Sequence, residues 1–182
     1  MRFEDFLVKS LGKGSVDSPL KKAACCDSSL SRFVGDNERI IYDVSFDNFN
    51  RCRETGEMPV SFEKAGPRGT IFFEPAKTKV AIITCGGLCP GLNNVMRSLV
   101  NQLYYRYGIS RILGIKYGYE GLIPKYNHPV IDLTASMVSD IHLSGGTFLG
   151  SSRGNQDVGQ MVDTLEILNI NVLFCIGGDG TL

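Results

Sequence analysis

The sequence lacks several features that would point to particular classes of protein. It has no tryptophan and only two histidines, and the 19 Lys and Arg residues are balanced by 19 Asp and Glu residues. A balanced charge gives no general attraction to nucleic acid or to an anionic membrane surface. Because His128 and His142 lie on separate segments, a histidine-based metal centre is not expected. We therefore expect neither nucleic acid nor a membrane among the partners.

Long apolar runs are also missing. The longest, residues 80–83 and 172–176, have the length of a β-strand and are far shorter than a bilayer span. Residues 1–5 carry acidic side chains where a secretory signal would carry lysines and then an apolar core. The six cysteines include no Cys-x-x-Cys pair, so we expect reduced thiols. These absences favour a cytoplasmic protein.

The chain has two regions of different texture. Residues 1–78 are irregular, with scattered aromatic residues and turn formers, and a turn at 62–69 leads into a short expected strand at 70–73. We interpret residues 1–78 as an extension packed on the body of the protein, because its aromatic side chains need a surface to bury against. Residues 79–182 form the second region.

The second region alternates strands with helices. Residues 79–84 are a continuous β-branched apolar run, which is typical of a strand that is covered on both faces. A glycine-rich loop follows, and then a helix is expected with Asn93 as its N-cap. The apolar residues of that helix fall at helical spacing on one face: Val95, Met96, Leu99, Val100 and Leu103.

Further elements continue the alternation. We expect strands at 111–116 and 171–176 and helices at 134–143 and 158–168. Repeated β-loop-α units predict an α/β fold with a doubly wound parallel sheet. In such a sheet the ligand-binding loops lie at the carboxyl ends of the strands.

The first loop of interest is residues 85–93, Cys-Gly-Gly-Leu-Cys-Pro-Gly-Leu-Asn. Its glycines allow backbone amides to approach an anion, and the following helix N-terminus adds favourable potential. It is neither a Walker A loop nor a Gly-x-Gly-x-x-Gly dinucleotide motif. A tight strand-to-helix turn with no ligand explains the glycines equally well.

The second loop, residues 145–154, combines flexible backbone, hydroxyl groups and the guanidinium of Arg153, which can bind phosphate oxygens in a bidentate manner. Its end, 150–154, matches the Gly-x-Ser-x-Gly pattern of a hydrolase nucleophile elbow. A hydrolase of the usual order needs a histidine after the nucleophile, and none follows Ser152. We therefore reject the hydrolase interpretation.

The third loop, 177–181, is Gly-Gly-Asp-Gly-Thr and directly follows the apolar run 172–176. Its glycines can wrap around a phosphate, and Asp179 is available for Mg²⁺. A fourth segment, 117–122, places Tyr119 at the same edge, where it either contacts a bound base or sugar or only packs the loop. Together, glycine loops at one sheet edge with one arginine and one carboxylate predict Mg²⁺-assisted polyphosphate binding.

These loops, taken together, resemble those of the 6-phosphofructokinase family. The resemblance covers residues 79–182, and segments 62–68 and 71–73 are similar to the long ATP-dependent branch found in plants, trypanosomatids and spirochaetes. It implies a phosphofructokinase-like fold, incomplete in this chain, and transfer of the ATP γ-phosphoryl group to fructose 6-phosphate in glycolysis. It also implies a homo-oligomer for the full-length protein.

The resemblance assigns roles to individual residues. It implies that Gly87 contacts ATP, that Arg153 and Gly154 reach its phosphates, and that Asp179 holds the catalytic Mg²⁺. Gly180 stands where pyrophosphate-dependent members carry aspartate, so ATP is the expected donor. The remaining expected ATP-binding residues are Gly178, Thr181 and Tyr119.

The family's catalytic base lies in a Thr-Ile-Asp motif downstream of the third loop, beyond Leu182. We therefore expect this chain to be a fragment of a larger kinase that is inactive alone. Two alternatives are a non-catalytic nucleotide-binding or regulatory module, and another kinase with a Gly-Gly-Asp-Gly-Thr loop, such as an NAD or diacylglycerol kinase.

Overall fold

The structure is a computed structural model that describes residues 8–21 and 32–181. The chain forms two compact units, Met1–Phe72 and Phe73–Leu182, and each is described here by itself. The four cysteines in the described ranges are free thiols, whereas Cys25 and Cys26 lie outside those ranges. No helix within the described ranges is long and apolar enough to cross a membrane.

The first unit contains two small antiparallel sheets. β1 (Val16–Asp17) pairs with β4 (Thr70–Ile71), and β2 (Arg39–Ile41) pairs with β3 (Ser61–Glu63). The strand expected at 70–73 is therefore present but shorter. Strands of two or three residues bury little surface, so this unit depends on turns and polar contacts as much as on apolar packing.

The only long helix among the described residues of the first unit is α2 (Phe46–Thr55). It begins at Ser45, whose hydroxyl accepts a hydrogen bond from the Asn48 amide, and it ends at Gly56, which has a φ of 71°. Its aromatic residues Phe46 and Phe49 stack on each other but remain 73% and 58% exposed. That the extension packs on the body remains a prediction from the sequence.

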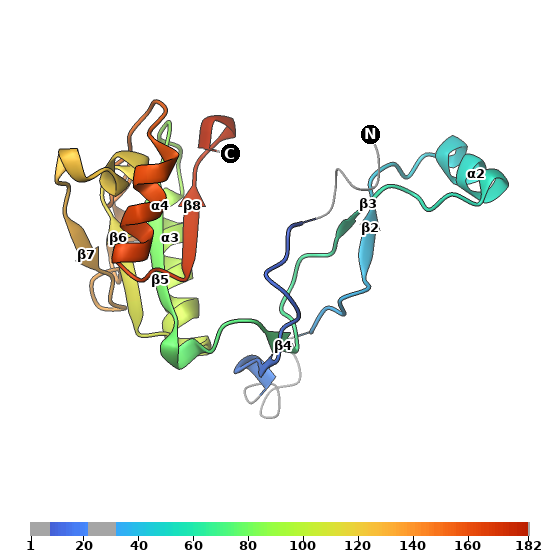
Figure 1. The fold of residues 1–182 in the computed structure, drawn as a ribbon, viewed down its shortest axis with the longest axis horizontal. Helices are drawn as coiled ribbons and strands as arrows, with labels where there is room; N and C mark the ends of the chain where they lie inside the picture. Colours follow the sequence, from blue (N-terminus) through green and yellow to red (C-terminus); the bar gives the residue numbers. More distant parts are fainter. Residues whose placement is uncertain (1–7, 22–31, 182) are drawn as a thin grey trace. The chain divides into compact units, whose positions relative to one another are not determined.

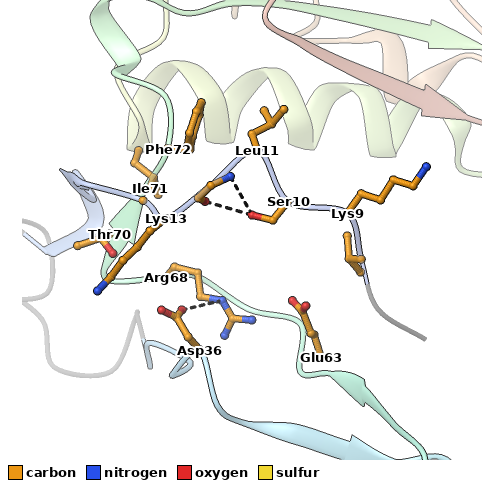
Figure 2. Close-up of a pocket in the computed structure, with 13 residues that line it drawn as sticks. Lys9, Ser10, Leu11, Lys13, Asp36, Glu63, Arg68, Thr70, Ile71 and Phe72 are labelled. Carbon is orange, nitrogen blue, oxygen red and sulfur yellow. Dashed lines mark hydrogen bonds and ion pairs between the residues drawn. The ribbon is translucent and has the colours of Figure 1, made fainter. Parts of the chain in front are cut away.

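A hollow of about 750 Å³ lies within the first unit (Figure 2). Its charged lining residues are of both signs: Lys9, Lys13, Asp36, Glu63 and Arg68. Arg68 faces Asp36 at 3.8 Å. Its guanidinium also donates hydrogen bonds to the main-chain carbonyl groups of Gly35 and Lys64. The guanidinium is thus held by the protein itself.

The second unit is built on a four-stranded sheet in the order β7-β6-β5-β8. β5 (Lys79–Thr84) is central and runs parallel to β6 (Arg111–Ile115) and β8 (Val172–Ile176). The edge strand β7 (Val130–Asp132) is antiparallel to β6 and was not predicted. The expected α/β class with a parallel sheet at its centre is confirmed.

Helices cover both faces of this sheet (Figure 1). α3 (Leu92–Asn101), which continues as the π-helical turn η3 (Gln102–Arg106), packs on one face, and α4 (Val158–Ile167) packs on the other. The shorter 3₁₀ turns are η2 (Pro75–Lys77), η4 (Gly118–Leu122), η5 (Pro124–Tyr126), η6 (Ile141–Leu143) and η7 (Asp179–Thr181).

The two faces of β5 supply two separate cores. Val80 and Ile82 pack with Met96 of α3, whereas Ala81 and Ile83 pack with residues of η4 and α4. All four β5 residues are fully buried. Side chains alternate between the faces of a strand, so an apolar residue is needed at every position when both faces are covered.

Two helix predictions were wrong. Residues 134–143 form turns and η6. The Thr134 hydroxyl accepts a hydrogen bond from the Met137 amide, as at a helix start, but the amides of Ser139, Leu143 and Ser144 then donate to carbonyl groups three residues back, so no α-helix continues. Asn93 is not the N-cap of α3, because the helix begins after Gly91 at a φ of 96°. Val95, expected on the buried face, is 47% exposed.

Candidate functional site

The carboxyl ends of β5 and β8 open into a cavity of about 410 Å³. Glycines dominate its lining, and Arg153 is its only charged lining residue. Of the eight expected ATP-binding residues, seven line the cavity, and Asp179 does not. The lining consists of Cys85, Gly86, Gly87, Tyr119, Ser152, Arg153, Gly154, Gly178, Gly180 and Thr181.

The first and second loops are bonded directly to each other. The Gly86 amide donates to the Ser152 carbonyl at 3.0 Å, and the Ser151 hydroxyl donates to the Gly86 carbonyl at 2.6 Å. Gly86 has a φ of 78°, which favours glycine. The first loop leaves the parallel strand β5, and the two bonds hold the second loop beside it.

The second loop begins on a support provided by Asn93. The Asn93 side chain donates to the Ser144 carbonyl at 3.0 Å and accepts from the Phe148 amide at 2.7 Å. Asn93 is buried, so both bonds are shielded from water. Its polar side chain therefore orders the second loop instead of starting the helix.

Arg153 projects from this ordered loop beside the first loop. A Cβ placed on Gly87 would lie 3.4 Å from an Arg153 guanidinium nitrogen, so the guanidinium and the Gly87 main chain are adjacent. Arg153 is exposed and has no ion-pair or hydrogen-bond partner among the described residues. A cation without an internal partner at a cavity lined by glycines is suited to an anionic ligand.

The third loop curls back on itself. The Thr181 amide donates to the Gly178 carbonyl at 2.8 Å, and a Cβ on Gly177 would lie 2.0 Å from the Thr181 hydroxyl oxygen. Only glycine fits at residue 177 without displacing Thr181. In contrast, a Cβ on Gly178 or Gly180 would meet no atom within 4 Å. These two glycines therefore leave space rather than fill a tight contact.

Asp179 lies at the tip of the third loop and is exposed. No group of three or more metal-binding side chains is present among residues 8–21 and 32–181. Mg²⁺ usually keeps several waters and takes one or two carboxylates together with phosphate oxygens. A single exposed carboxylate beside a phosphate-sized cavity fits that coordination.

Tyr119 reaches the cavity from η4. Its hydroxyl donates to the Thr181 carbonyl at 2.6 Å, so the hydroxyl is engaged by the third loop. Burial, together with the neighbouring Cys175 thiol, raises the pKa of Tyr119 to about 12. The phenol is therefore neutral at physiological pH and acts as a hydrogen-bond donor.

Three lining residues were not among the predicted site residues: Cys85, Gly86 and Ser152. All three are neighbours of predicted residues in the same loops, which is the signal that could have identified them. Burial raises the pKa of the Cys85 thiol, so the thiol stays protonated and is a poor nucleophile. A second hollow of about 380 Å³ shares Gly87 and Arg153 with this cavity, and its further lining includes Leu88, Thr147, Gly150 and Ser151.

The fold and this edge define a doubly wound α/β protein with a glycine-lined cavity at the carboxyl ends of its parallel strands. Comparison with known families is consistent with that class. Residues 79–182 match the phosphofructokinase family (Phosphofructokinase), which is more than half of the chain. The chain belongs to the phosphofructokinase family.

Individual relatives extend the similarity into the first unit. The chain is 46% identical to the ATP-dependent 6-phosphofructokinase of Borreliella burgdorferi, over 97% of this chain and 39% of that protein. It is 42% identical to the enzyme of the same name from Trypanosoma brucei brucei, over 98% of this chain and 36% of that protein. The expected similarity to the spirochaete and trypanosomatid branch is confirmed.

A solved structure supports the fold. The crystal structure of Pichia pastoris phosphofructokinase in the T-state aligns with a TM-score of 0.50 and 22% sequence identity, over 96% of this chain and 19% of that chain. The chain spans about two fifths of the length of the Borreliella and Trypanosoma relatives described above.

Proposed function

We propose that this chain provides the ATP-phosphate-binding part of an ATP-dependent 6-phosphofructokinase, which transfers the γ-phosphoryl group of ATP to fructose 6-phosphate. The proposal is supported by the relatives described above, which are ATP-dependent 6-phosphofructokinases. The observation that carries it is the convergence of three glycine loops and Arg153 on one cavity.

The cavity suits a polyphosphate because of what lines it. Glycine main chain at Gly87, Gly154 and Gly178 lets phosphate oxygens approach backbone amides closely. The Arg153 guanidinium adds a positive charge and a fork of donors that matches phosphate geometry. Phosphoryl transfer depends mainly on positioning and charge stabilisation, which these groups supply without a nucleophile of their own.

Asp179 is the residue that would hold Mg²⁺, with phosphate oxygens and water as the remaining ligands. When bound, the metal neutralises charge on the phosphates. Asp179 is exposed, so its side chain is accessible to such a complex from solvent. Asp179 does not line the cavity, but its neighbours Gly178 and Gly180 do, so its carboxylate would hold the metal beside the phosphates.

Gly180 supports ATP as the phosphoryl donor. The open space around its Cα leaves room for a nucleotide phosphate. A carboxylate at this position would occupy that space and repel a neighbouring phosphate. We therefore propose that the absence of a side chain at Gly180 favours ATP over pyrophosphate.

Calorimetric titration of the chain with ATP, with and without Mg²⁺, tests the proposal. We expect measurable binding that is strengthened by Mg²⁺ and that loses this strengthening in Asp179→Ala. Asp163→Ala is the matched control, because Asp163 is an exposed carboxylate on α4. Absence of ATP binding, or equal behaviour of the two variants, would contradict the proposed function.

A further inference from the structure

Residues 117–122, here called the Tyr119 turn, contact all three phosphate-site loops. The turn contains η4 and directly follows β6 in the sequence. The sequence left two roles open for Tyr119, contact with a bound base or sugar and packing of the loop alone. The contacts of the turn indicate a different role, which rests on the proposed function.

The turn is seated tightly against the end of β5. Gly118 has a φ of 59°, and a Cβ there would lie 2.8 Å from both the Cys85 sulfur and the Thr84 carbonyl oxygen. A Cβ on Gly121 would lie 2.1 Å from the Lys116 carbonyl oxygen. Only glycine, which has no Cβ, fits at these two positions. The backbone of the turn is therefore closely packed and has little freedom to shift.

The turn is also bonded to the second loop. The Tyr117 amide donates to the Leu149 carbonyl at 2.9 Å, and the Glu120 amide faces the Ser152 hydroxyl at 3.5 Å. On its outer side Glu120 lies 3.6 Å from His128, whose ring packs against Tyr117 with ring centroids 4.5 Å apart. These contacts add a second set of restraints on the turn.

From this fixed position Tyr119 reaches the third loop. Its ring packs against the core that contains Ile83 and Cys85, while its hydroxyl donates to the Thr181 carbonyl at 2.6 Å. Thr181 is only 9% exposed, whereas Gly178, Asp179 and Gly180 are all exposed. Thr181 is therefore the buried anchor of an otherwise exposed loop, and Tyr119 holds that anchor by its carbonyl group.

We propose that Tyr119 is a positioning residue: its hydroxyl fixes Thr181 and thereby sets where the third loop presents Asp179 and its backbone amides to the bound polyphosphate. Tyr119 acts through the loop and does not need to touch the nucleotide base. The phosphate chain and its metal are the ligand parts that sense this hydrogen bond.

The substitution Tyr119→Phe isolates the hydroxyl, because the ring and its packing are kept. ATP and inorganic tripolyphosphate, each with Mg²⁺, are the two probes. One hydrogen bond contributes enough free energy for a change of about three- to tenfold in affinity. We expect Tyr119→Phe to weaken both probes by the same factor in that range, since both carry the phosphates.

A double variant shows whether the hydroxyl acts through the metal-binding loop. In the Asp179→Ala background, Tyr119→Phe should have a clearly smaller effect on the affinity for either probe, because the positioned carboxylate is gone. Equal effects in both backgrounds would overturn the proposal. So would a loss for ATP without a loss for tripolyphosphate, which is the signature of base contact.

Hydrogen exchange of the Thr181 amide, measured without any ligand, separates failure of this inference from failure of the proposed function. The Thr181 amide donates within the loop, so its exchange reports the curled form. Tyr119→Phe should accelerate this exchange about three- to tenfold. Unchanged exchange overturns the inference whether or not the chain binds ATP. If the unmodified chain binds neither probe, the proposed function fails, and the exchange rate alone decides whether Tyr119 holds the loop.

Tyr105→Phe is the matched control for both measurements. Tyr105 is 68% exposed on η3, and its ring packs against the ring of Tyr104. Removing its hydroxyl should leave the affinity for both probes and the exchange of Thr181 unchanged. Thermal unfolding of the unmodified chain and of every variant establishes that each is folded before the affinities are compared.

Discussion

One hollow in each unit of this protein invites comparison, and the pair differ in chemistry more than in size. The hollow of the first unit is larger, about 750 Å³, but its lining carries charges of both signs (Figure 2). The cavity of the second unit is about 410 Å³ and is lined by glycine main chain and a single arginine. A polyphosphate needs close backbone amides and is repelled by carboxylates. The smaller cavity has glycine main chain and no carboxylate in its described lining, so it is the better site.

The arginines in the two hollows illustrate this difference. Arg68 in the first unit donates to the Gly35 and Lys64 carbonyl groups and faces Asp36, so its donors serve the fold. Arg153 in the second unit has no such partner among the described residues. A charged residue is informative about ligands when the protein itself does not use its hydrogen-bonding groups.

The largest expected effect concerns packing. Leu149 is fully buried in the second unit, so Leu149→Ala should lower the free energy of unfolding by about 2–5 kcal/mol. Phe46 is 73% exposed in the first unit, and Phe46→Ala should change stability by no more than about 0.5 kcal/mol. Chemical denaturation of both variants measures the two values. Comparable losses would contradict the contrast between a packed and an open region.

The next effect concerns the two arginines. Arg153→Ala should weaken ATP binding by about tenfold to a hundredfold, since hydrogen bonds to charged groups contribute about 1.5–3 kcal/mol. Arg68→Ala should leave ATP affinity unchanged, because Arg68 lines the other hollow. Titration calorimetry of both variants provides the comparison. A loss of affinity from Arg68→Ala equal to that from Arg153→Ala would remove the distinction between the hollows.

A smaller effect distinguishes two glycines. Gly180→Asp should weaken ATP binding by about tenfold through charge repulsion, whereas Gly180→Ala should bind nearly as the unmodified chain does, since a Cβ there meets open space. Competition with pyrophosphate completes the test: if Gly180→Asp keeps its preference for ATP, Gly180 does not set donor choice.

In the first unit a Cβ on Gly14 would lie 2.9 Å from the Ile71 main chain, so Gly14→Ala should destabilise that unit without changing ATP affinity.

The sequence predicted the central elements of the second unit well. The strand 79–84 has the predicted bounds because it is a continuous apolar run of strand length. The helix expected at 158–168 is α4 (Val158–Ile167), because its apolar residues recur at helical spacing. The helix expected at 134–143 was wrong. There the buried residues Leu133, Val138 and Ile141 are brought inward by turns, and spacing alone does not reveal this.

The candidate site was predictable in outline and not in detail. The first and third loops follow the parallel strands β5 and β8, so the sheet rule alone brings Gly87 and Gly178 to one edge. The second loop follows no parallel strand, and Arg153 reaches this edge through the bonds between Gly86 and residues 151–152. The sequence does not reveal that Asn93 supports the second loop or that the Tyr119 hydroxyl is engaged by Thr181. Those bonds join residues more than fifty positions apart, and their geometry depends on the final packing.

The smallest effect is a difference in pH sensitivity. In the first unit, the Lys21 ammonium group lowers the pKa of Asp17, and the Gly35 amide with Lys64 lowers that of Glu38. A lowered folded-state pKa means that stability is present above the unfolded pKa and is lost as pH falls, here below about pH 4. The first unit should therefore weaken slightly in acid.

The second unit should respond to alkali instead. Burial raises the pKa of the Cys85 and Cys175 thiols and raises that of Tyr119 to about 12. A raised pKa gives stability that is complete below the unfolded pKa and is lost as pH rises, here from about pH 8.5 upwards. Amide signals of each unit, followed by NMR across pH, measure both responses. Loss of the second unit first in acid would contradict this assignment.

The account depends most on which hollow receives the polyphosphate. Titration of isotope-labelled chain with magnesium tripolyphosphate, followed by amide NMR, tests this directly. We predict that the shifted signals are those of the three loops around the smaller cavity, including Gly87, Gly154 and Thr181. Shifts centred instead on residues 9–14 and 68–72, which line the larger hollow, would contradict the account.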